Sequence, residues 1–528
     1  MAFQWYTVAG FGGGLNLSTH PAAIADQEWS WCNGWIPRLG TAETARDYML
    51  PFGTGSVASG YNVTCLFPIP IDVASVGHVH LGLLAVSGTG PAVKIYHLDT
   101  VTTNLTEITR LGATVGAGAQ PYGGSAAIFN NTIVINGGLV GGSNAMMRWN
   151  GSSGSQYVAL PVPNVGANFF RSFNDRLFAI GVDASSTGAI ASRILAWSDP
   201  LSDSVWIRLN DNTADYVLLH DSFSGATGLE ALNGNTLGIF HSTSIEGVAA
   251  TGGTPAFTRQ LIAAGVGAYE PGSTGVMQPL GPIPGGVLFM GPDDYYVTAG
   301  GSPERIGSKL GRYLTTRLTP ATSVTMLRGV KWWPEQGVVI VPCPNPSATT
   351  VELMLFEPAT GAWSRQVPTI TTNGAFGLLN HGVAPNIHVI ANGANLWVQQ
   401  RTGGNFQVGA YVHTKDFALG GPGQAVYVDR IKVDWEARGN LDAVLEVRAI
   451  MRTEMGSGVS MVGSPGQEAD LQDSMVTLGT LTRNVSELPC RLKGKYLRLS
   501  FTQSAFGARV RGFSFRWAPA NDRFNRFA

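Results

Sequence analysis

The sequence predicts an all-β protein, in which a β-propeller of about seven blades is followed by a β-sandwich domain that the N-terminal arm joins. Three observations favour this fold class: a sequence pattern that recurs seven times between residues 65 and 405, a composition rich in turn formers, and period-two alternation of apolar and polar residues near the C-terminus. The 528 residues include 68 Gly and 29 Pro, and 44% of them are hydrophobic. Such proportions are typical of a turn-dense globular protein rather than of a disordered chain.

Each copy of this repeated pattern consists of two short apolar runs separated by a turn of Gly, Ser, Thr or Asp. The gaps between successive copies are 50, 44, 61, 49, 51 and 50 residues, measured between the equivalent centres Leu84, Val134, Phe178, Ile239, Leu288, Val339 and Val389. A period of roughly 40 to 50 residues is typical of a propeller with one four-stranded blade per repeat. Runs such as 132–135 and 338–341 are short and β-branched, which indicates strands that are buried on both faces.

Composition divides the chain into an arm (residues 1–60), the propeller (61–410) and a C-terminal sandwich domain (411–528). The arm is rich in Gly and holds four of the 13 Trp residues, namely Trp5, Trp29, Trp31 and Trp35. Since it is too short to close a core, we expect it to pack on the other end of the chain or on a neighbouring subunit.

Residues 426–437 and 443–451 alternate apolar and polar side chains, and strand signals resume in 495–503 and 508–518. This pattern indicates an antiparallel sandwich with one solvated or partner-facing side.

Charge is distributed unevenly along the chain, although its formal net charge is −1. Residues 483–528 contain ten Lys or Arg against two acidic residues, whereas the rest of the chain has 24 basic and 33 acidic residues. Three interpretations stay open: a solvated sandwich face, a charged subunit contact, or a polyanion contact that includes nucleic acid. The candidate subunit or polyanion contacts are Arg491, Lys493, Lys495, Arg498, Arg509 and Arg511.

Motifs for a catalytic, metal or cofactor site are weak, and we expect none of these sites. His78 and His80 would share one face of a strand, but the sequence places no third metal ligand near them. The run 210–215 resembles half of a calcium loop, without the Gly and the closing Glu that such a loop needs. Asp293 and Asp294 share one turn, where adjacent side chains point apart instead of forming a catalytic pair.

The remaining sequence signals concern the compartment of the protein. Four cysteines lie far apart, at Cys32, Cys65, Cys343 and Cys490, which favours reduced structural thiols in a chain folded in a cytosol. No stretch approaches the ~20 apolar residues of a membrane span, so we expect no membrane-spanning segment. The first residues lack the basic start and apolar core of a secretion signal.

Short motifs spread over nearly the whole chain resemble virion propeller proteins of tailed bacteriophages. They are Gly13-Gly14-Leu15-Asn16 and Arg38-Leu39-Gly40 in the arm, 173–178 and Trp197-Ser198-Asp199-Pro200 in the repeat, 286–289 with Tyr295-Tyr296 further on, and Lys415-Asp416-Phe417 with 494–498 near the C-terminus. Within that group, the chain is most similar to the tail nozzle of short-tailed phages, the tail tubular protein B type.

This resemblance implies a structural protein of the virion tail and not an enzyme. The expected role is a homo-oligomeric ring, a hexamer, that retains genomic DNA and then conducts it out during ejection. The resemblance also implies contacts with adaptor and portal proteins and with tail fibres or spikes, assembly in the host cytoplasm, and no cofactor. Two alternatives stay open: an outward-facing receptor-binding, glycan-binding or adaptor propeller, and a glycan-degrading propeller enzyme.

Overall fold

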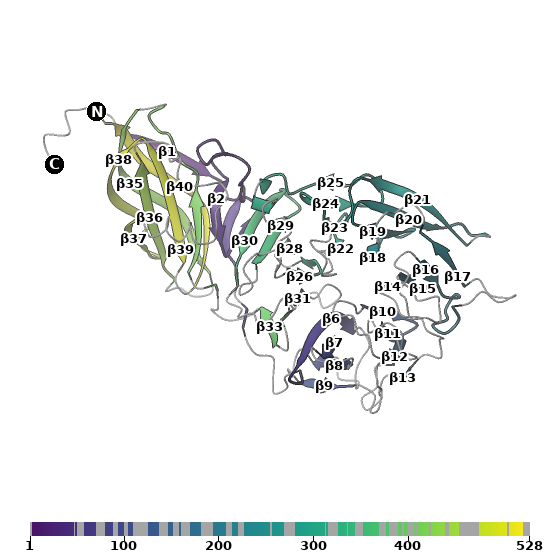
Figure 1. Ribbon diagram of the computed structural model, residues 1–528. Coiled ribbons are helices and arrows are strands. Elements are labelled where there is room, and N and C mark those ends of the chain that lie inside the picture. Colours follow the sequence, from purple (N-terminus) through teal and green to yellow (C-terminus); the bar gives the residue numbers. More distant parts are fainter. Residues whose placement is uncertain are drawn as a thin grey trace.

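The computed structural model of the chain has almost exclusively β-structure (Figure 1). It describes residues 3–46, 48–49, 57–69, 80–87, 93–99, 104–108, 125–136, 146–150, 158–159, 169–180, 194–206, 214–219, 226–253, 256–268, 280–311, 313–314, 326–334, 336–343, 352–368, 376–379, 389–392, 395–399, 406–407, 409–421, 424–438, 443–452, 475–503 and 506–520. No helix in these ranges has the length and apolar character that spanning a bilayer would require.

Seven sheets within these ranges form the blades of a propeller, each with four antiparallel strands in sequence order, apart from the closing blade (Figure 1). The first three blades are β6 to β9 (Tyr61–Ile69, His80–Ser87, Val93–Asp99, Leu105–Glu107), β10 to β13 (Ser125–Phe129, Thr132–Asn136, Met146–Trp149, Val158–Ala159) and β14 to β17 (Phe169–Phe173, Arg176–Ile180, Ile194–Trp197, Asp215–Leu218). The next three are β18 to β21 (Ala226–Asn233, Thr236–His241, Ser244–Ala250, Phe257–Ala264), β22 to β25 (Leu280–Ile283, Gly286–Met290, Tyr295–Thr298, Glu304–Arg305) and β27 to β30 (Lys331–Trp333, Val338–Cys343, Glu352–Glu357, Ala362–Gln366). The predicted fold class is confirmed.

The seven repeat centres of the sequence all fall on the second strand of a blade. Leu84 lies on β7, and the other six lie on β11, β15, β19, β23, β28 and the closing blade's β32 (Val389–Asn392). In β15, β19 and β23, second strands with a neighbouring strand on each side, almost every side chain is buried whichever way it points. This double burial explains why the second strands carry the clearest repeat in the sequence.

The closing blade combines strands from both ends of the propeller sequence. It consists of β31 (Phe376–Leu379), β32, β33 (Asn395–Gln399) and β5 (Tyr48–Met49), which pairs antiparallel with β33. A further strand, β26 (Met326–Arg328), pairs parallel with β31. The strand β31 lies against β6 of the first blade, which closes the ring of inner strands. Residues 48–49, which composition placed in the arm, are therefore part of the propeller.

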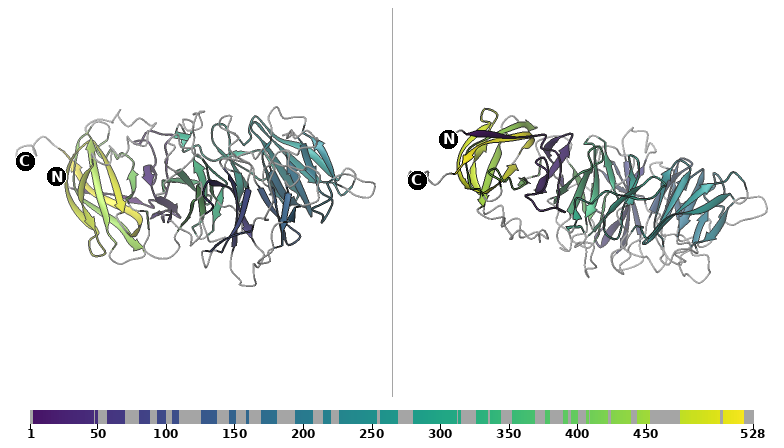
Figure 2. Two further views of the ribbon diagram at one scale, coloured as in Figure 1. Left: turned by 60° about the horizontal axis from the view of Figure 1, so that its bottom comes forward. Right: turned by 90° about the horizontal axis from the view of Figure 1, so that it is seen from above.

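The other two sheets form a sandwich from both ends of the chain (Figure 2). One sheet has the order β3-β4-β40-β35-β38, with β1 also paired to β40, and the other has the order β2-β34-β39-β36-β37. The N-terminal strands are β1 (Gln4–Ala9), β2 (Trp29–Asn33), β3 (Trp35–Arg38) and β4 (Thr41–Thr44). The C-terminal strands are β34 (Ala410–Thr414), β35 (Val426–Arg438), β36 (Leu445–Arg452), β37 (Val476–Leu481), β38 (Glu487–Gly494), β39 (Tyr496–Gln503) and β40 (Gly507–Pro519). The arm thus packs on the other end of the chain.

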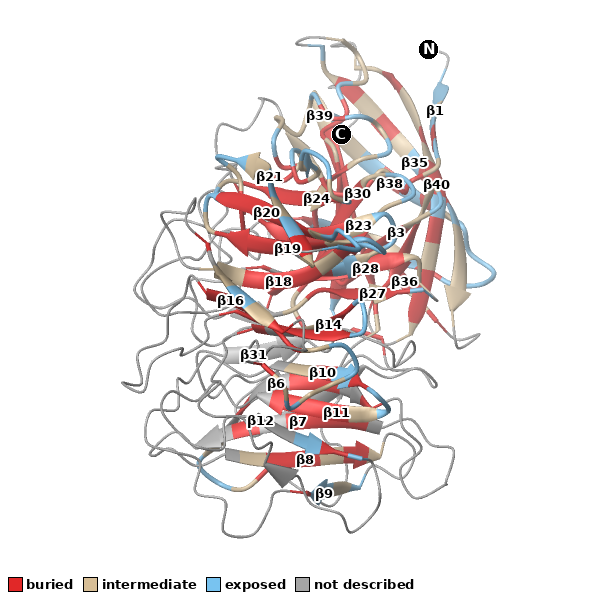
Figure 3. Ribbon diagram, turned by 90° about the vertical axis from the view of Figure 1, so that its right-hand side faces the viewer, coloured by how far each residue is buried: buried red, intermediate tan, exposed pale blue. Residues whose placement is uncertain are grey.

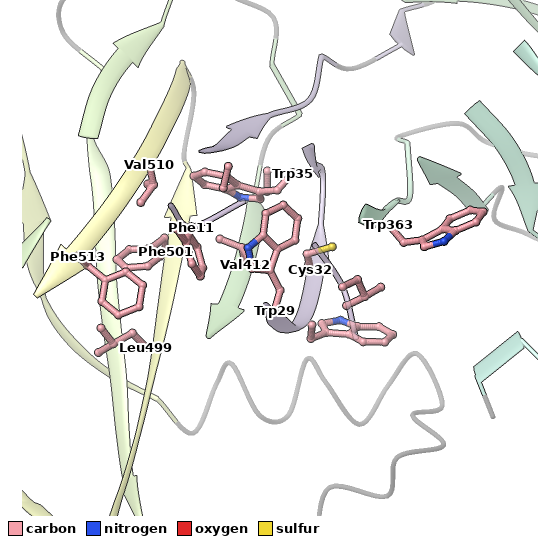
Figure 4. Close-up of a cluster of buried hydrophobic side chains, with 14 of the residues drawn as sticks. Phe11, Trp29, Cys32, Trp35, Trp363, Val412, Leu499, Phe501, Val510 and Phe513 are labelled. Atoms are coloured by element: carbon pink, nitrogen blue, oxygen red, sulfur yellow. The ribbon is translucent and has the colours of Figure 1, made fainter. Parts of the chain in front are cut away.

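One hydrophobic core continues from the sandwich through the arm into the fifth and sixth blades (Figures 3 and 4). Trp29 and Trp35 of the arm and Trp363 of β30 are fully buried in it. The arm also bonds to the sixth blade through its backbone, since the Leu15 amide donates to the Trp363 carbonyl over 2.6 Å and the Gly34 amide donates to the Arg365 carbonyl over 2.9 Å. Sandwich and propeller therefore bury apolar surface against each other, and burial of apolar surface is the main contribution to the stability of a fold.

Candidate assembly surface

Eight of the ten basic residues of the C-terminal segment lie in the described ranges: Arg483 in the turn before β38, and the others on β38, β39 and β40 and in the turn between β38 and β39. Four of the six described arginines do not contribute to a patch of like charge, because they are bound to carboxylates from other parts of the chain. Arg498 is buried and donates to Asp416 through Nε (2.7 Å to Oδ1) and through Nη2 (2.8 Å to Oδ2). This bidentate geometry is the strongest hydrogen-bonded arrangement of a guanidinium and a carboxylate. Arg498 is thereby held inside the protein.

Arg509 and Arg511 of β40 face acidic residues of two neighbouring strands. Arg509 binds Glu43 of β4 over 2.5 Å and approaches Glu436 of β35 at 3.5 Å. Arg511, which is half exposed, binds Glu436 over 2.6 Å and lies 3.5 Å from Asp434. These rows of opposite charge across neighbouring strands are the favourable pairs of an antiparallel sheet.

Further ion pairs extend this pattern over the outer face of the same sheet. Arg516 donates from Nε to Asp429 over 2.9 Å, and Asp429 accordingly has a lowered pKa because Arg516 bonds to it. Arg430 binds Glu487 over 2.6 Å. The acids Glu43, Asp416, Asp429, Asp434 and Glu436 all lie outside residues 483–528. Four of the ten basic side chains of the C-terminal segment are therefore matched in space by acids that the sequence places elsewhere.

The other three candidates lie on the free edge of this sheet or beside it. Arg491 and Lys493 are exposed on β38, and Lys495 is half exposed in the turn before β39. Arg491 and Lys495 have no ion pair within the described part of the chain. The structure thus separates the six candidates into the buried and paired Arg498, the paired side chains of Arg509 and Arg511 on the sheet face, and three exposed or half-exposed side chains at or beside its edge.

A buried histidine lies beside the Arg498 pair on β34. His413 is 1% exposed and sits opposite Ser500 of β39, and its Nε2 atom has no hydrogen-bond partner. Burial, together with the positive charges of Arg498 and Arg452, lowers the pKa of His413 to about 3. His413 is therefore neutral at physiological pH, in contrast to an unperturbed histidine, which titrates near pH 6.5.

The junction between the sandwich and the sixth blade contains a second buried ion pair. Arg365 of β30 donates to Glu352 of β29 over 2.8 Å and to the Tyr313 hydroxyl over 3.1 Å. Tyr313 in turn donates to Glu352. The Arg365 guanidinium lies over the Trp31 ring of β2, 4.8 Å from its centroid, which is within the range of a cation–π contact. Trp31 of the arm is thereby fixed against the sixth blade.

Of the weaker sequence motifs, the pair Asp293 and Asp294 lies within the described ranges, in the turn between β23 and β24. Asp294 is buried and bonded to Arg305, and Asp293 lies 3.6 Å from the same guanidinium and accepts a hydrogen bond from Tyr296 over 2.8 Å, so Arg305 contacts both carboxylates. Burial raises the pKa of Asp294 despite the bond from Arg305. No group of three or more His, Cys, Asp or Glu in the described chain could hold a metal ion.

Other sequence candidates lie partly outside the described residues. His78 and most of the run 210–215 fall there, and the side chains of His80 and Cys65 are likewise outside the description. The three other cysteines, Cys32, Cys343 and Cys490, are buried and form no disulfide in the described part of the chain.

The acidic partners were missed in the sequence because each is distant along the chain. Arg509 and Glu43 are separated by 466 positions, and Arg498 and Asp416 by 82. One signal was available, since Asp416 belongs to the Lys415-Asp416-Phe417 motif that precedes the sandwich.

No protein-family model matches the chain, and no curated protein matches it in sequence. Among solved structures, it is similar to a streptogramin B lyase, with a TM-score of 0.40 and 11% identity over 67% of this chain and 98% of that one. It is similar to YCF48 bound to a D1 peptide, with a TM-score of 0.39 and 10% identity over 68% and 98% of the two chains. It is also similar to virginiamycin B lyase from Staphylococcus aureus, with a TM-score of 0.39 and 9% identity over 66% and 98%. At such identities these similarities say nothing about activity, ligands or partners.

Substitution of Asp416 by Asn should destabilise the sandwich by about 3 kcal/mol or more, because it leaves the Arg498 charge buried without a counter-charge. The matched control is Glu487→Gln, which breaks the exposed pair with Arg430 and should cost at most about 1 kcal/mol. Urea unfolding followed by tryptophan fluorescence measures both changes. Equal effects of the two substitutions would contradict the assigned difference in burial.

The lowered pKa of His413 predicts an acid-sensitive sandwich. Because the folded pKa of about 3 lies below the unfolded value, the unfolded chain binds the extra proton first, and stability falls as the pH drops below about 6.5. His413→Phe removes this titration and should reduce the stability lost between pH 7 and pH 5 by about 2 kcal/mol. Unfolding midpoints at both pH values, measured with wild type alongside, test this prediction. An unchanged pH dependence would show that His413 is accessible to protons in the folded state.

Proposed function

We propose that this protein is a structural component of a bacteriophage tail that assembles into a ring of the nozzle type. In this role it retains genomic DNA and conducts it during ejection, and it anchors fibres or spikes. The proposal is based on the resemblance of the arm, repeat and sandwich motifs to virion propeller proteins. It assigns no catalytic residue, and it places the protein in the virion tail.

The observation that carries the proposal is that both chain ends fold into one sandwich fixed to the sixth blade. Trp29 and Trp35 connect that sandwich to the blade core, and the buried Arg365 pair holds Trp31 against the blade. This construction makes sandwich and propeller one stiff unit. Stiff subunits are suited to a closed ring. Head-to-tail contacts between subunits generate a closed ring only when the angle between neighbouring subunits is fixed.

The pairing of charges supports the conduit part of the proposal. Affinity for DNA grows with the number of phosphates that basic side chains neutralise. Arg498, Arg509, Arg511 and Arg516 are all bound to carboxylates of the same chain. A sheet face whose arginines are already paired would hold the DNA backbone weakly, as passage through a channel requires.

Imaging of the purified full-length chain tests the ring. Single-particle electron microscopy should show closed rings of about six copies with an open axial channel. Deletion of the arm is a poor test, because residues 1–40 supply β1 to β3 and part of the core. Particles that remain monomers at all accessible concentrations, or that form only open chains, would contradict the nozzle proposal.

Binding to duplex DNA tests the conduit. Wild type should bind weakly at physiological salt and with little salt dependence. The double variant Asp429→Asn, Glu436→Gln removes the partner of Arg516 and the nearer of the two partners of Arg511, so its binding should become tighter and its salt slope steeper by about 1 to 2. The matched control is Glu107→Gln, Asp203→Asn, which releases Lys94 and Arg148 on the propeller. Fluorescence anisotropy over a salt series measures all three proteins.

Tight, salt-sensitive binding of wild-type protein would overturn the conduit proposal. A variant that binds no better than wild type would show that the carboxylates do not neutralise the sandwich arginines. Equal gains in both double variants would show that the sandwich face has no special part in contact with DNA.

A further inference from the structure

The sandwich sheet that contains β34, β36 and β39 carries buried polar side chains on its outer face. The inner face of this sheet belongs to the hydrophobic core, through residues such as Val447 and Phe501. On the outer face, His413, Arg498 and Ser500 are at most 2% exposed. Polar groups at such depth are normally hydrogen-bonded, so an unbonded group among them needs an explanation.

Strand pairing places these polar side chains next to one another. Ser500 of β39 is directly opposite His413 of β34, and Arg498 is opposite Ile450 of β36. Residues directly opposite each other share a face of the sheet, and so do residues two positions apart along a strand. Arg452, two positions after Ile450, therefore lies on the same face as Arg498. β36 and β39 pair over the whole of β36 without a register shift, so this placement is regular.

Within the described chain, two polar atoms of this face lack a hydrogen-bond partner. They are the hydroxyl oxygen of Ser500 and the Nε2 atom of His413, and both are shielded from solvent. Leaving such atoms unbonded is costly, because folding removes them from water. Both can donate to an acceptor, the serine through its O–H group and a neutral histidine through an Nε2–H tautomer.

The charge of Arg452 is only partly matched. The side chain is 17% exposed, and its guanidinium makes no hydrogen bond in the part of the chain that the structure describes. Oδ2 of Asp416 lies 3.9 Å from Nη1 of Arg452, but Asp416 already forms its bidentate pair with Arg498. Burial, together with the charge of Arg498, accordingly lowers the pKa of Arg452. Two arginines thus share one carboxylate.

The neighbouring charges on this face are balanced and do not supply a second acid to Arg452. Nε of Arg448 donates to Glu446 over 2.8 Å, and Glu446 also accepts from the Thr477 hydroxyl over 3.0 Å. These bonds keep the pKa of Glu446 lowered, with the bond from Arg448 as the main cause. The excess positive charge is therefore located at Arg452 and Arg498.

We propose a binding site for a small oxyanion of the phosphate type on this face, formed by Arg452, Arg498, Ser500 and His413. Guanidinium groups bind such anions through paired N–H donors, and the anion oxygens would accept from the two atoms that lack a partner. The anion would also supply the negative charge that Arg452 lacks. Arg452, as the partly exposed member, connects the buried side chains with solvent.

Burial also restricts the class of ligand. Ser500 is fully buried, and a DNA duplex is too wide to reach it, so the anion must be small and free. This site is therefore different from a polyanion contact on the sheet surface, and it does not depend on the proposed ring.

Calorimetric titration of the full-length protein with inorganic phosphate tests the site, at constant ionic strength so that screening of surface charges does not change. Wild type should bind a single phosphate per chain, and sulfate should compete with it. Arg452→Gln removes the unmatched charge and should weaken phosphate binding about tenfold or more.

Ser500→Ala separates a binding role from a structural one. Because the hydroxyl is unbonded, its removal should leave the protein at least as stable as wild type, whereas phosphate should bind several-fold more weakly. The matched control is Arg430→Gln, which removes an exposed arginine of the other sandwich sheet from its pair with Glu487. This control should bind phosphate as wild type does.

Wild type that binds no phosphate, or an Arg452→Gln or Ser500→Ala variant with unchanged affinity, would overturn the site. Equal loss of affinity in the Arg430→Gln control would do the same. Displacement of phosphate by a short DNA duplex would overturn the assignment to a small oxyanion. Phosphate binding by a chain that forms no rings would contradict the proposed function alone, so the two proposals can fail separately.

Discussion

The structure depends on how the tryptophans of the arm are buried between the sandwich and the sixth blade. Trp29 and Trp35 have no core of their own, and burying such large side chains is worth on the order of 2 to 3 kcal/mol each. That burial requires the C-terminal strands on one side and β30 on the other. The two ends of the chain are therefore joined because neither can cover these side chains alone.

Electrostatics follows from the same arrangement. Once the arm lies beside β40, Glu43 reaches Arg509, and the segment before the sandwich brings Asp416 to Arg498. A buried pair of this kind adds little net stability, but it penalises any packing that separates its partners. The buried Arg365 and Glu352 pair has the same effect at the junction with the propeller. Apolar burial thus holds the parts together, and the ion pairs determine how they fit.

The sequence predicts those parts of the fold in which local pattern and burial agree. The second strands β15, β19 and β23 are almost entirely buried, so their short apolar runs repeat visibly. The partners of the basic residues were not predictable, because Glu43 and Arg509 are brought together by the fold and not by spacing along the chain. The same applies to β5, whose two residues in the arm complete a blade more than 340 positions away. Pairing over such separations depends on topology, which no local pattern records.

The central claim is that the arm and the C-terminal strands form one cooperative unit with the sixth blade. Hydrogen–deuterium exchange of the full-length protein tests it most directly, because backbone amides exchange when the strands that bury them open. The account predicts that amides of β2 are as strongly protected as those of its partner β34 and of β39, and that mild denaturant exposes all three together. Rapid exchange throughout β2 while β34 and β39 stay protected would show that the arm is a loosely attached extension and would contradict the account.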